Sequence, residues 1–365
     1  MSVTIKVRLV ANLDSGDATM EDHWLCIDIG YTYSRYFVWD GKSFVDSEKK
    51  ITSRPNIDDG GDAELRKHMW MEQLAKDVGA WKEKWPKIGR VGLSFPGVVN
   101  REGAIWSTTA IWGVAQSDLT QQVLAEALAM PVTVLNDLSA AVIRYGTADK
   151  YASSNYVMVV SVSSGVGAKL YDREANRLIL EKRGRNGEIG LAVVDETPDA
   201  TVTRNGRLVG VLGHYCSGSA FPRQLRAAAQ DAAQQGRYET SRFAAILAEA
   251  GQDLYNSDRI LINEAAVKAI LLGDQFCIDV LSGSIKYLAN VLHIAILLNA
   301  PDSIVIVGGF ARSIGKLYTD ILSSQLADML GLIYTPEEVM GMVDLGENDD
   351  MDNIWGLVSR MKQGL

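Results

Sequence analysis

Apolar and polar positions in the first part of the chain follow the patterns of β-strands joined by tight turns. The apolar run Trp24–Ile29 leads into a short polar turn, and Tyr33–Trp39 reads as the returning strand. The Asp40-Gly41 pair marks a second hairpin turn before a third strand near Phe44. Further elements predicted are a helix over 63–81, a strand over 88–95, a helix capped by Ser117 that ends before Pro131, a strand over 132–135 and a helix over 138–145.

A second strand-turn-strand unit of the same design begins roughly 130 positions later. The β-branched run 155–162 is followed by a turn rich in glycine and serine, and then by a strand that returns to Tyr171. Helices are expected through 219–250 and 258–299, a strand over 304–307 and a helix over 352–365. The repetition predicts two α/β lobes of similar topology, hinged near Gly146–Asn155, that face each other across a nucleotide.

The turn after Trp24–Ile29 carries residue types suited to phosphate. Gly30 lets the backbone come close to an anion, Thr32 offers a hydroxyl and an N–H, and Asp28 can reach a magnesium ion or its water shell. The same string also fits an ordinary hairpin turn with a capping threonine.

The order of several short motifs resembles the ROK family (repressors, open reading frames and sugar kinases). The resemblance covers roughly residues 24–315 and is loose over 222–280. The matching segments are Asp28-Ile29-Gly30-Tyr31-Thr32, Gly92–Gly97, Pro131–Asp137, Ser163–Ala168, Gly187–Gly190, Ser217-Gly218 and Ile304–Gly309.

The resemblance implies the two-lobed actin-like ATPase fold, with two ribonuclease-H-like lobes around a nucleotide cleft. It implies an N-terminal lobe over 21–146, joined by the C-terminal helix 352–365, and a C-terminal lobe over 147–351. The implied activity is ATP-dependent phosphorylation of a hexose or related sugar. ATP and Mg²⁺ are the implied cofactors, and a homodimer is the family default.

The resemblance also assigns roles to individual residues. Asp137 becomes the general base and Asn136 a sugar ligand, although a carboxylate at that place also fits a helix N-cap. Glu188 becomes a sugar ligand, with a solvated loop carboxylate as the alternative. His214 lies near a sugar-binding position of the family, yet it also fits a packed or surface histidine. The implied nucleotide-binding residues are Asp28, Gly30, Thr32, Ser163, Ser164, Gly165, Gly167, Gly308 and Gly309, with Asp28 holding Mg²⁺ through water.

Some positions depart from the family pattern. Leu191 replaces a zinc-binding histidine, and the window 206–213 contains no cysteine, so we expect no zinc site. Gly213 stands where the family has a sugar-contacting glutamate, which predicts a different ring or weak binding. Tyr31 and Ser163 replace glycines in the two phosphate loops. These changes keep open a second function, a catalytically weak or inactive sensor of sugar or nucleotide.

Composition narrows the remaining possibilities. The 365 residues carry a net charge of −9, which argues against a nucleic-acid surface. Cys26, Cys216 and Cys277 show no pairing pattern, and no stretch approaches the length needed to span a membrane, so a cytoplasmic location is expected. Residues 1–20 have no counterpart in the family, and an added edge strand, a mobile tail and a subunit contact all remain open.

Overall fold

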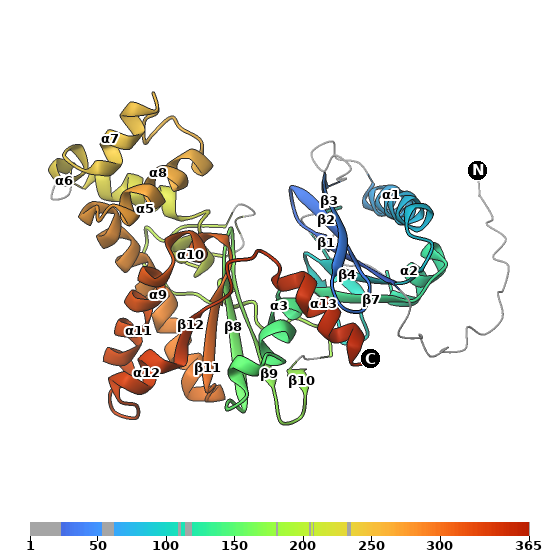
Figure 1. Cartoon of the computed structure of the whole chain (residues 1–365). Helices are drawn as coiled ribbons and strands as arrows, with labels where there is room; N and C mark the ends of the chain where they lie inside the picture. The colour runs from blue at the N-terminus through green and yellow to red at the C-terminus, as the bar shows by residue number, and fades with distance from the viewer. Residues whose placement is uncertain are drawn as a thin grey trace.

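The computed structural model describes residues 23–52, 62–108, 111–113, 119–179, 182–203, 206, 208–231 and 235–364. These residues form two α/β lobes side by side, joined by helix α3 and by the chain that returns near the C-terminus (Figure 1). The predicted fold class is confirmed, because this mixed α/β architecture matches solved two-lobed structures across the chain. The predicted extension 1–20 lies outside the described residues.

The N-terminal lobe is built on a five-stranded sheet with the order β3-β2-β1-β4-β7. The strands are β1 (His23–Ile29), β2 (Tyr33–Trp39), β3 (Phe44–Ile51), β4 (Ile88–Phe95) and β7 (Val132–Asn136), with the small hairpin β5 (Val98–Val99) and β6 (Ile105–Ser107) beside them. The helices α1 (Ala63–Lys84) and α2 (Gln121–Leu128) belong to the same lobe. Buried aromatic and aliphatic side chains of α1, such as Trp70 and Leu74, join those of the sheet in one core.

The C-terminal lobe repeats this arrangement with the order β10-β9-β8-β11-β12. In each lobe the first strand pairs antiparallel with the second and parallel with a later one. The strands are β8 (Tyr156–Val162), β9 (Val166–Asp172), β10 (Arg177–Ile179), β11 (Ser303–Val307) and β12 (Val343–Leu345). The turn of each lobe's first hairpin therefore lies at the edge of its sheet that faces the interlobe cleft.

Helices cover the C-terminal sheet and extend from it. They are α4 (Gly213–Cys216), α5 (Phe221–Gln230), α6 (Gln235–Glu239), α7 (Arg242–Glu249), α8 (Arg259–Leu271), α9 (Gln275–Asn299), α10 (Gly309–Ile314), α11 (Lys316–Leu330) and α12 (Pro336–Met342), with short 3₁₀ turns at Asp149–Tyr151 and Ile189–Leu191. The sequence interpretation that no stretch could span a membrane needs correction, because α9 is long and apolar enough by length and composition. Nine of its residues are buried in the lobe.

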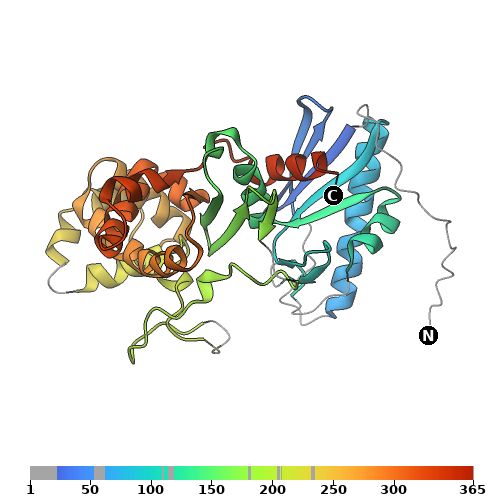
Figure 2. The ribbon, with the colours of Figure 1, turned by 90° about the horizontal axis from the view of Figure 1, so that it is seen from below.

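Two connections join the lobes. Helix α3 (Asp137–Gly146) begins at the end of β7 and packs against β8 and β9. Residues 346–353, which we call the crossing segment, run from β12 to helix α13 (Asp352–Lys362). Figure 2 shows α13 lying on the N-terminal lobe, where it packs against Cys26 and Trp39.

One predicted helix start was wrong. The helix before Pro131 begins at Gln121, and Thr120 caps it by accepting a hydrogen bond from the Val123 backbone N–H. Leu119, which the spacing placed on the helix, instead bridges Ile105 of β6. Ser117, the expected cap, lies outside the described residues.

Candidate active site

A polar cavity of about 410 Å³ lies between the lobes where their first hairpins meet. Arg35, Asn136 and Asp137 line it from the N-terminal side, and residues 163–167 with Gly308-Gly309 line it from the C-terminal side. A second, more apolar cavity of about 740 Å³ shares Ser163, Ser164 and Gly309 with the first. The two cavities together provide adjoining polar and apolar compartments, as a nucleotide with its phosphates and base requires.

Asp137 is the first residue of α3 and faces the polar cavity. Its Oδ1 accepts hydrogen bonds from Asn136 Nδ2 at 2.7 Å and from the Leu138 backbone N–H at 2.8 Å. Its Oδ2 has no donor among the residues that the structure describes. Removal from water raises the pKa of Asp137 to about 6, and this outweighs the lowering by the Leu138 N–H. A carboxylate with one free oxygen and this pKa can accept a proton near neutral pH.

Asn136 provides the helix cap that the sequence had offered to Asp137 as an alternative role. Its Oδ1 accepts a hydrogen bond from the Ser139 backbone N–H at 3.0 Å. Its Nδ2 donates to the Gly97 carbonyl at 2.8 Å as well as to Asp137. Asn136 therefore fixes the end of β7 and the direction of the Asp137 carboxylate, and its expected contact with sugar stays a prediction.

Glu188 lies on a loop that is held tightly against β9. The Ala168 backbone N–H donates to the Gly187 carbonyl at 2.8 Å, and Lys169 Nζ donates to the Asn186 carbonyl at 2.9 Å. Gly187 has φ +93°, and a Cβ there would lie 1.9 Å from the Ala168 oxygen, so the close approach requires glycine. The loop thereby presents the exposed Glu188 carboxylate to the same cavity as Asp137.

The second phosphate loop is open to the cavity. The Ser163 backbone N–H donates to the Gly165 carbonyl at 2.9 Å, and the Ser163 carbonyl accepts from the Gly218 N–H at 2.7 Å. A Cβ at Gly165 would meet no protein atom within 4 Å. Ser163, Ser164, Gly165, Gly167, Gly308 and Gly309 all line the cavity, so the structure brings together the C-terminal half of the expected nucleotide site.

The first phosphate loop is arranged differently. Gly30, Tyr31 and Thr32 are not among the residues that line the cavity, and Asp28 lies beneath Arg35. Asp28 Oδ2 accepts from Arg35 Nη2 at 2.7 Å and from Arg35 Nε at 3.2 Å, while Oδ1 accepts from Ser94 Oγ and Asn353 Nδ2, each at 2.8 Å. These four donors use the four acceptor positions of a carboxylate. Magnesium at Asp28 does not fit this arrangement, and its expected metal role stays a prediction.

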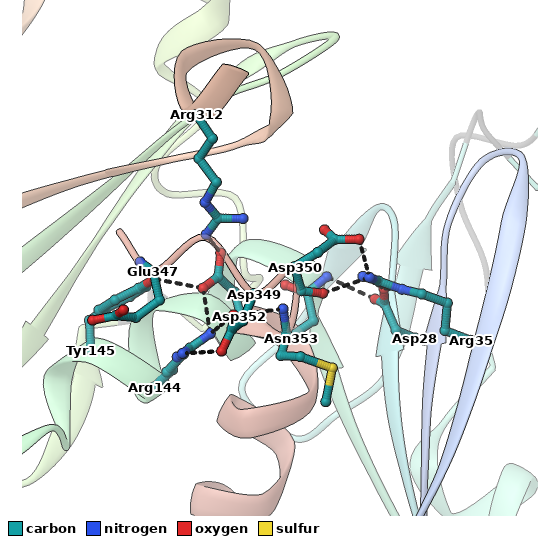
Figure 3. A network of polar contacts seen from close by, with 11 residues as sticks. Asp28, Arg35, Arg144, Tyr145, Arg312, Glu347, Asp349, Asp350, Asp352 and Asn353 are labelled. Carbon is teal, nitrogen blue, oxygen red and sulfur yellow. Dashed lines mark hydrogen bonds and ion pairs between the residues drawn. The ribbon is translucent and has the colours of Figure 1, made fainter. Parts of the chain in front are cut away.

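The crossing segment carries acidic side chains that bind arginines of both lobes (Figure 3). Arg35 of β2 pairs with Asp350, and Arg312 of α10 pairs with Asp352. Asp352 also accepts hydrogen bonds from Tyr145 at 2.7 Å and Arg144 at 3.0 Å. The segment thus ties the two lobes together at the side of the polar cavity, which Asp350, Asp352 and Asn353 line.

His214 lies on α4, next to the 3₁₀ turn that follows Glu188, and it is not among the residues lining the polar cavity. Its Nδ1 is buried without a hydrogen-bond partner. Its expected contact with sugar therefore stays a prediction that this geometry does not favour.

The expectation of no zinc site also stays a prediction. Across the described ranges, no group of three or more His, Cys, Asp or Glu side chains is placed to hold a metal ion.

The sequence reasoning missed the cations that line the cavity: Arg35, Lys169 and Arg312. A signal was present for Arg35, because the turn between β1 and β2 sets a register in which Arg35 lies directly opposite Asp28. An opposite-charge pair across a predicted phosphate hairpin could have been read from the sequence. Arg312 and the crossing segment gave no comparable signal, since their partners are far away along the chain.

Comparisons with known proteins agree on one family. The family model described as ROK family matches residues 24–336. The chain is 28% identical over 283 residues to a C(7)-cyclitol 7-kinase of Streptomyces hygroscopicus subsp. limoneus, covering 77% of this chain and 76% of the relative. It is 22% identical over 325 residues to a 2-epi-5-epi-valiolone 7-kinase of an Actinoplanes strain, covering 85% and 83%. A ROK family glucokinase from Streptomyces griseus, solved with glucose and AMPPNP, superposes with a TM-score of 0.71 at 18% identity, covering 94% and 100%.

Proposed function

This chain belongs to the ROK family and is a sugar kinase, and we propose that it transfers the γ-phosphoryl group of ATP to a primary hydroxyl of a ring polyol. The observation that carries the proposal is Asp137, whose free Oδ2 faces a cavity that the second phosphate loop lines from the opposite lobe. A base and a phosphate cradle on opposite walls are what an in-line transfer to a hydroxyl needs.

In the proposed reaction, Asp137 accepts the proton of the acceptor hydroxyl while the oxygen of that hydroxyl forms a bond to the γ-phosphorus. The bond from that phosphorus to the β–γ bridging oxygen breaks, and ADP leaves. A hydroxyl is a weak nucleophile, so this general base contributes about 100- to 10,000-fold to the rate. A magnesium ion held by Asp28 does not fit the site, because the oxygens of this carboxylate already accept four hydrogen bonds.

The nucleotide would lie across the two cavities. The backbone N–H groups of Ser164 and Gly165 in the second phosphate loop suit the phosphates, and the apolar cavity beside Phe310 and Val267 suits the base. Gly308 has φ +98°, and a Cβ there would lie 2.5 Å from the Val162 oxygen, so the close packing of the segment Ile304–Gly309 against β8 requires glycine at this position. AMPPNP in the Streptomyces griseus glucokinase supports ATP as the donor.

For the acceptor, we propose a hexose or a seven-carbon cyclitol. The two curated relatives are named as kinases that act at position 7 of such cyclitols. In a seven-carbon cyclitol with a six-carbon ring, one carbon lies outside the ring, so both acceptor classes offer an exocyclic hydroxymethyl group. Gly213, where the family has a sugar-contacting glutamate, supports a ring other than glucose. A homodimer and a cytoplasmic location remain predictions.

One observation favours a second function, a sensor that binds ligand without efficient transfer. Arg35 covers Asp28, so the first phosphate loop does not reach the polar cavity. If transfer requires this loop to contact ATP, a protein in which the loop stays outside the cavity binds nucleotide without turning over.

A coupled assay of ADP release separates the two functions. The panel contains hexoses, N-acetylhexosamines and seven-carbon cyclitols, each with ATP and Mg²⁺. Acceptor-dependent ADP release with at least one ring polyol, with phosphate found on the exocyclic carbon by mass spectrometry and NMR, supports the kinase. ATP binding by calorimetry with no release above the acceptor-free rate for every compound contradicts it and favours the sensor.

A further inference from the structure

We propose that Arg35 is the residue of the N-terminal lobe that contacts the terminal phosphate of the nucleotide, and that Asp28 and Asp350 hold its guanidinium in position. This inference rests on the proposed function for its ligand, ATP. It gives Asp28 the role of a positioning residue for Arg35 instead of a metal ligand.

The first support is the location of Arg35 relative to its neighbours. Strand β2 alternates, so Arg35 points to the α13 face of the sheet together with Phe37 and Trp39, while Ser34 and Tyr36 are buried on the other face. Its guanidinium covers Asp28 and lines the polar cavity, which Asp28 does not. From β1, β2 and the turn between them, Arg35 is therefore the group that an entering phosphate meets.

The second support is the contrast between the two carboxylates that bind Arg35. The Asp28 side chain is only 7% exposed, and its Oδ2 accepts hydrogen bonds from both Nε and Nη2 of Arg35. Asp350 has a side chain 85% exposed, and its Oδ2 and backbone carbonyl accept from Nη1 at 2.5 and 2.6 Å. Asp350 also has a positive φ of 53°, which is unfavourable for a residue with a Cβ. The buried anchor is fixed, whereas the exposed contact can be exchanged for a phosphate oxygen.

The third support is the charge of the cavity. Four carboxylates line it, from Asp137, Glu188, Asp350 and Asp352. On the C-terminal side, Lys169 donates to the Asn186 carbonyl, and Arg312 pairs with Asp352, whose side chain is only 9% exposed. Arg35 differs from them because one of its two carboxylate partners, Asp350, is exposed. ATP brings about four further negative charges, so a cation must face its phosphates. Arg35 meets this need, because replacing Asp350 by a phosphate frees both Nη1 hydrogens for the planar, two-point contact that arginine makes with phosphate.

The test measures nucleotide binding by calorimetry, without an acceptor and without turnover. Wild-type protein, Arg35→Ala and Arg35→Lys are titrated with ATP, ADP and AMP, once with Mg²⁺ and once with EDTA. Lys84→Ala is the matched control, because it removes one positive charge of the same lobe from an exposed pair with Asp46. Thermal unfolding of every variant accompanies the titrations.

Loss of a charged hydrogen bond to phosphate predicts that Arg35→Ala binds ATP about 10- to 100-fold more weakly. The loss for ADP is smaller, and AMP affinity stays within about two-fold of wild type. Arg35→Lys keeps the charge but not the planar fork, so its loss lies between wild type and Arg35→Ala. Lys84→Ala matches wild type. With EDTA, wild-type protein still prefers ATP over AMP, and this preference is reduced in Arg35→Ala, in which only the second phosphate loop remains to contact the phosphates.

Three outcomes overturn the inference. These are unchanged ATP affinity in both variants, an equal loss for ATP, ADP and AMP, or a preference for ATP that vanishes from wild-type protein in EDTA. The last of these outcomes would support Asp28 as a magnesium ligand. If Arg35→Ala does not fold, Arg35→Lys decides by the same comparison of nucleotides. This test is independent of the test of the proposed function. If the preference for ATP depends on Arg35 but the protein phosphorylates no acceptor, this inference is supported and the proposed kinase activity is contradicted.

Discussion

The two hairpins that face the cleft share a topology, yet they present different chemistry to it. The hairpin of β8 and β9 offers an open backbone turn at Ser163–Gly165, where an added Cβ would meet no protein atom. The backbone loop of the β1–β2 hairpin does not line the cavity, and this hairpin offers the side chain of Arg35. In the β8–β9 hairpin, the backbone turn forms the site. In the β1–β2 hairpin, a salt-bridged side chain forms it.

This difference shows that a repeated fold does not require a repeated means of binding. A backbone turn depends on local φ and ψ angles and on glycine. A guanidinium depends on partners that hold it, and here one of these comes from the far end of the chain.

Asp137→Asn should reduce turnover by about 100- to 10,000-fold while nucleotide binding stays near wild type, because the amide keeps the shape but cannot take a proton. Wild-type turnover should rise with pH through about 6, since Asp137 acts as a base only when ionised. Steady-state kinetics from pH 5 to 8 measure both effects. Wild-type turnover in the variant would show that Asp137 is not the base.

The same variant gives a readout in stability. A carboxylate whose folded pKa is raised favours folding at low pH and loses that contribution as pH rises through about 6. Asp137→Asn should therefore gain in Tm relative to wild type above pH 6, and the difference should shrink towards pH 4. An unchanged difference across this range would contradict the raised pKa.

Asp352→Ala should lower the free energy of unfolding by about 3 to 5 kcal/mol, because it leaves the buried guanidinium of Arg312 and its neighbours without their carboxylate. Asp349→Ala is the matched change, since the Asp349 side chain is 42% exposed and, among the arginines that the structure describes, pairs with Arg144 alone. We expect it to cost at most about 1 kcal/mol. Urea unfolding of both variants measures the two losses of unfolding free energy. Equal losses would show that the contacts of Asp352 stabilise the protein no more than the exposed pair of Asp349 does.

Gly165→Ala should weaken ATP binding about 3- to 10-fold with little change in Tm, because the methyl group enters the cavity and not the protein. Gly236→Ala on α6 is a control in which the added Cβ also meets nothing within 4 Å, at a site outside the lining of the cavity. Calorimetry with ATP compares the two. Equal affinities in both variants would mean that phosphate does not approach this backbone turn.

Tyr31→Gly should change ATP and acceptor affinities by less than about two-fold. Tyr31 is 57% exposed and does not line the polar cavity, so we expect its ring neither to crowd a phosphate nor to contact the acceptor. Separate titrations of ATP and acceptor decide. Tighter ATP binding by Tyr31→Gly would show that the backbone loop of the β1–β2 hairpin approaches the nucleotide. The two hairpins would then both bind ATP through their backbone turns.

Much of the fold could be predicted because its signals are local. Alternating or continuous apolar runs located β1, β2, β4, β7 and β8, and the two glycine-containing turns located the hairpins. The start of α2 was missed, because Ser117 and Thr120 are both good N-caps and only the structure shows that Leu119 pairs with β6. Helix α9 lies within the predicted helical region 258–299, but the expectation that no stretch is long and apolar enough to span a membrane was wrong for it.

The site was predictable where its residues lie at the ends of strands. Asp137, Glu188 and the Ser163–Gly167 loop line one cavity, as the motif order implied. His214 does not join them, because it lies on a short helix behind the loop of Glu188. Arg312 and Asp352 could not be paired from sequence, since no periodicity relates residues that meet only after both lobes and the crossing segment are in place.

The contact of Asn353 with Asp28 joins residues 325 positions apart, and it sets an order for biosynthesis. The first hairpin emerges early from the ribosome, but one of the four donors to its buried carboxylate appears only when at least residue 353 has been made. Until then Asp28 lacks one of its four donors, and the α13 face of the first sheet, around Cys26 and Trp39, stays uncovered. Closing so long a loop is slow. The N-terminal lobe should therefore reach its final packing after the C-terminal lobe has been synthesised, which leaves its apolar face as the part of the nascent chain most in need of a chaperone.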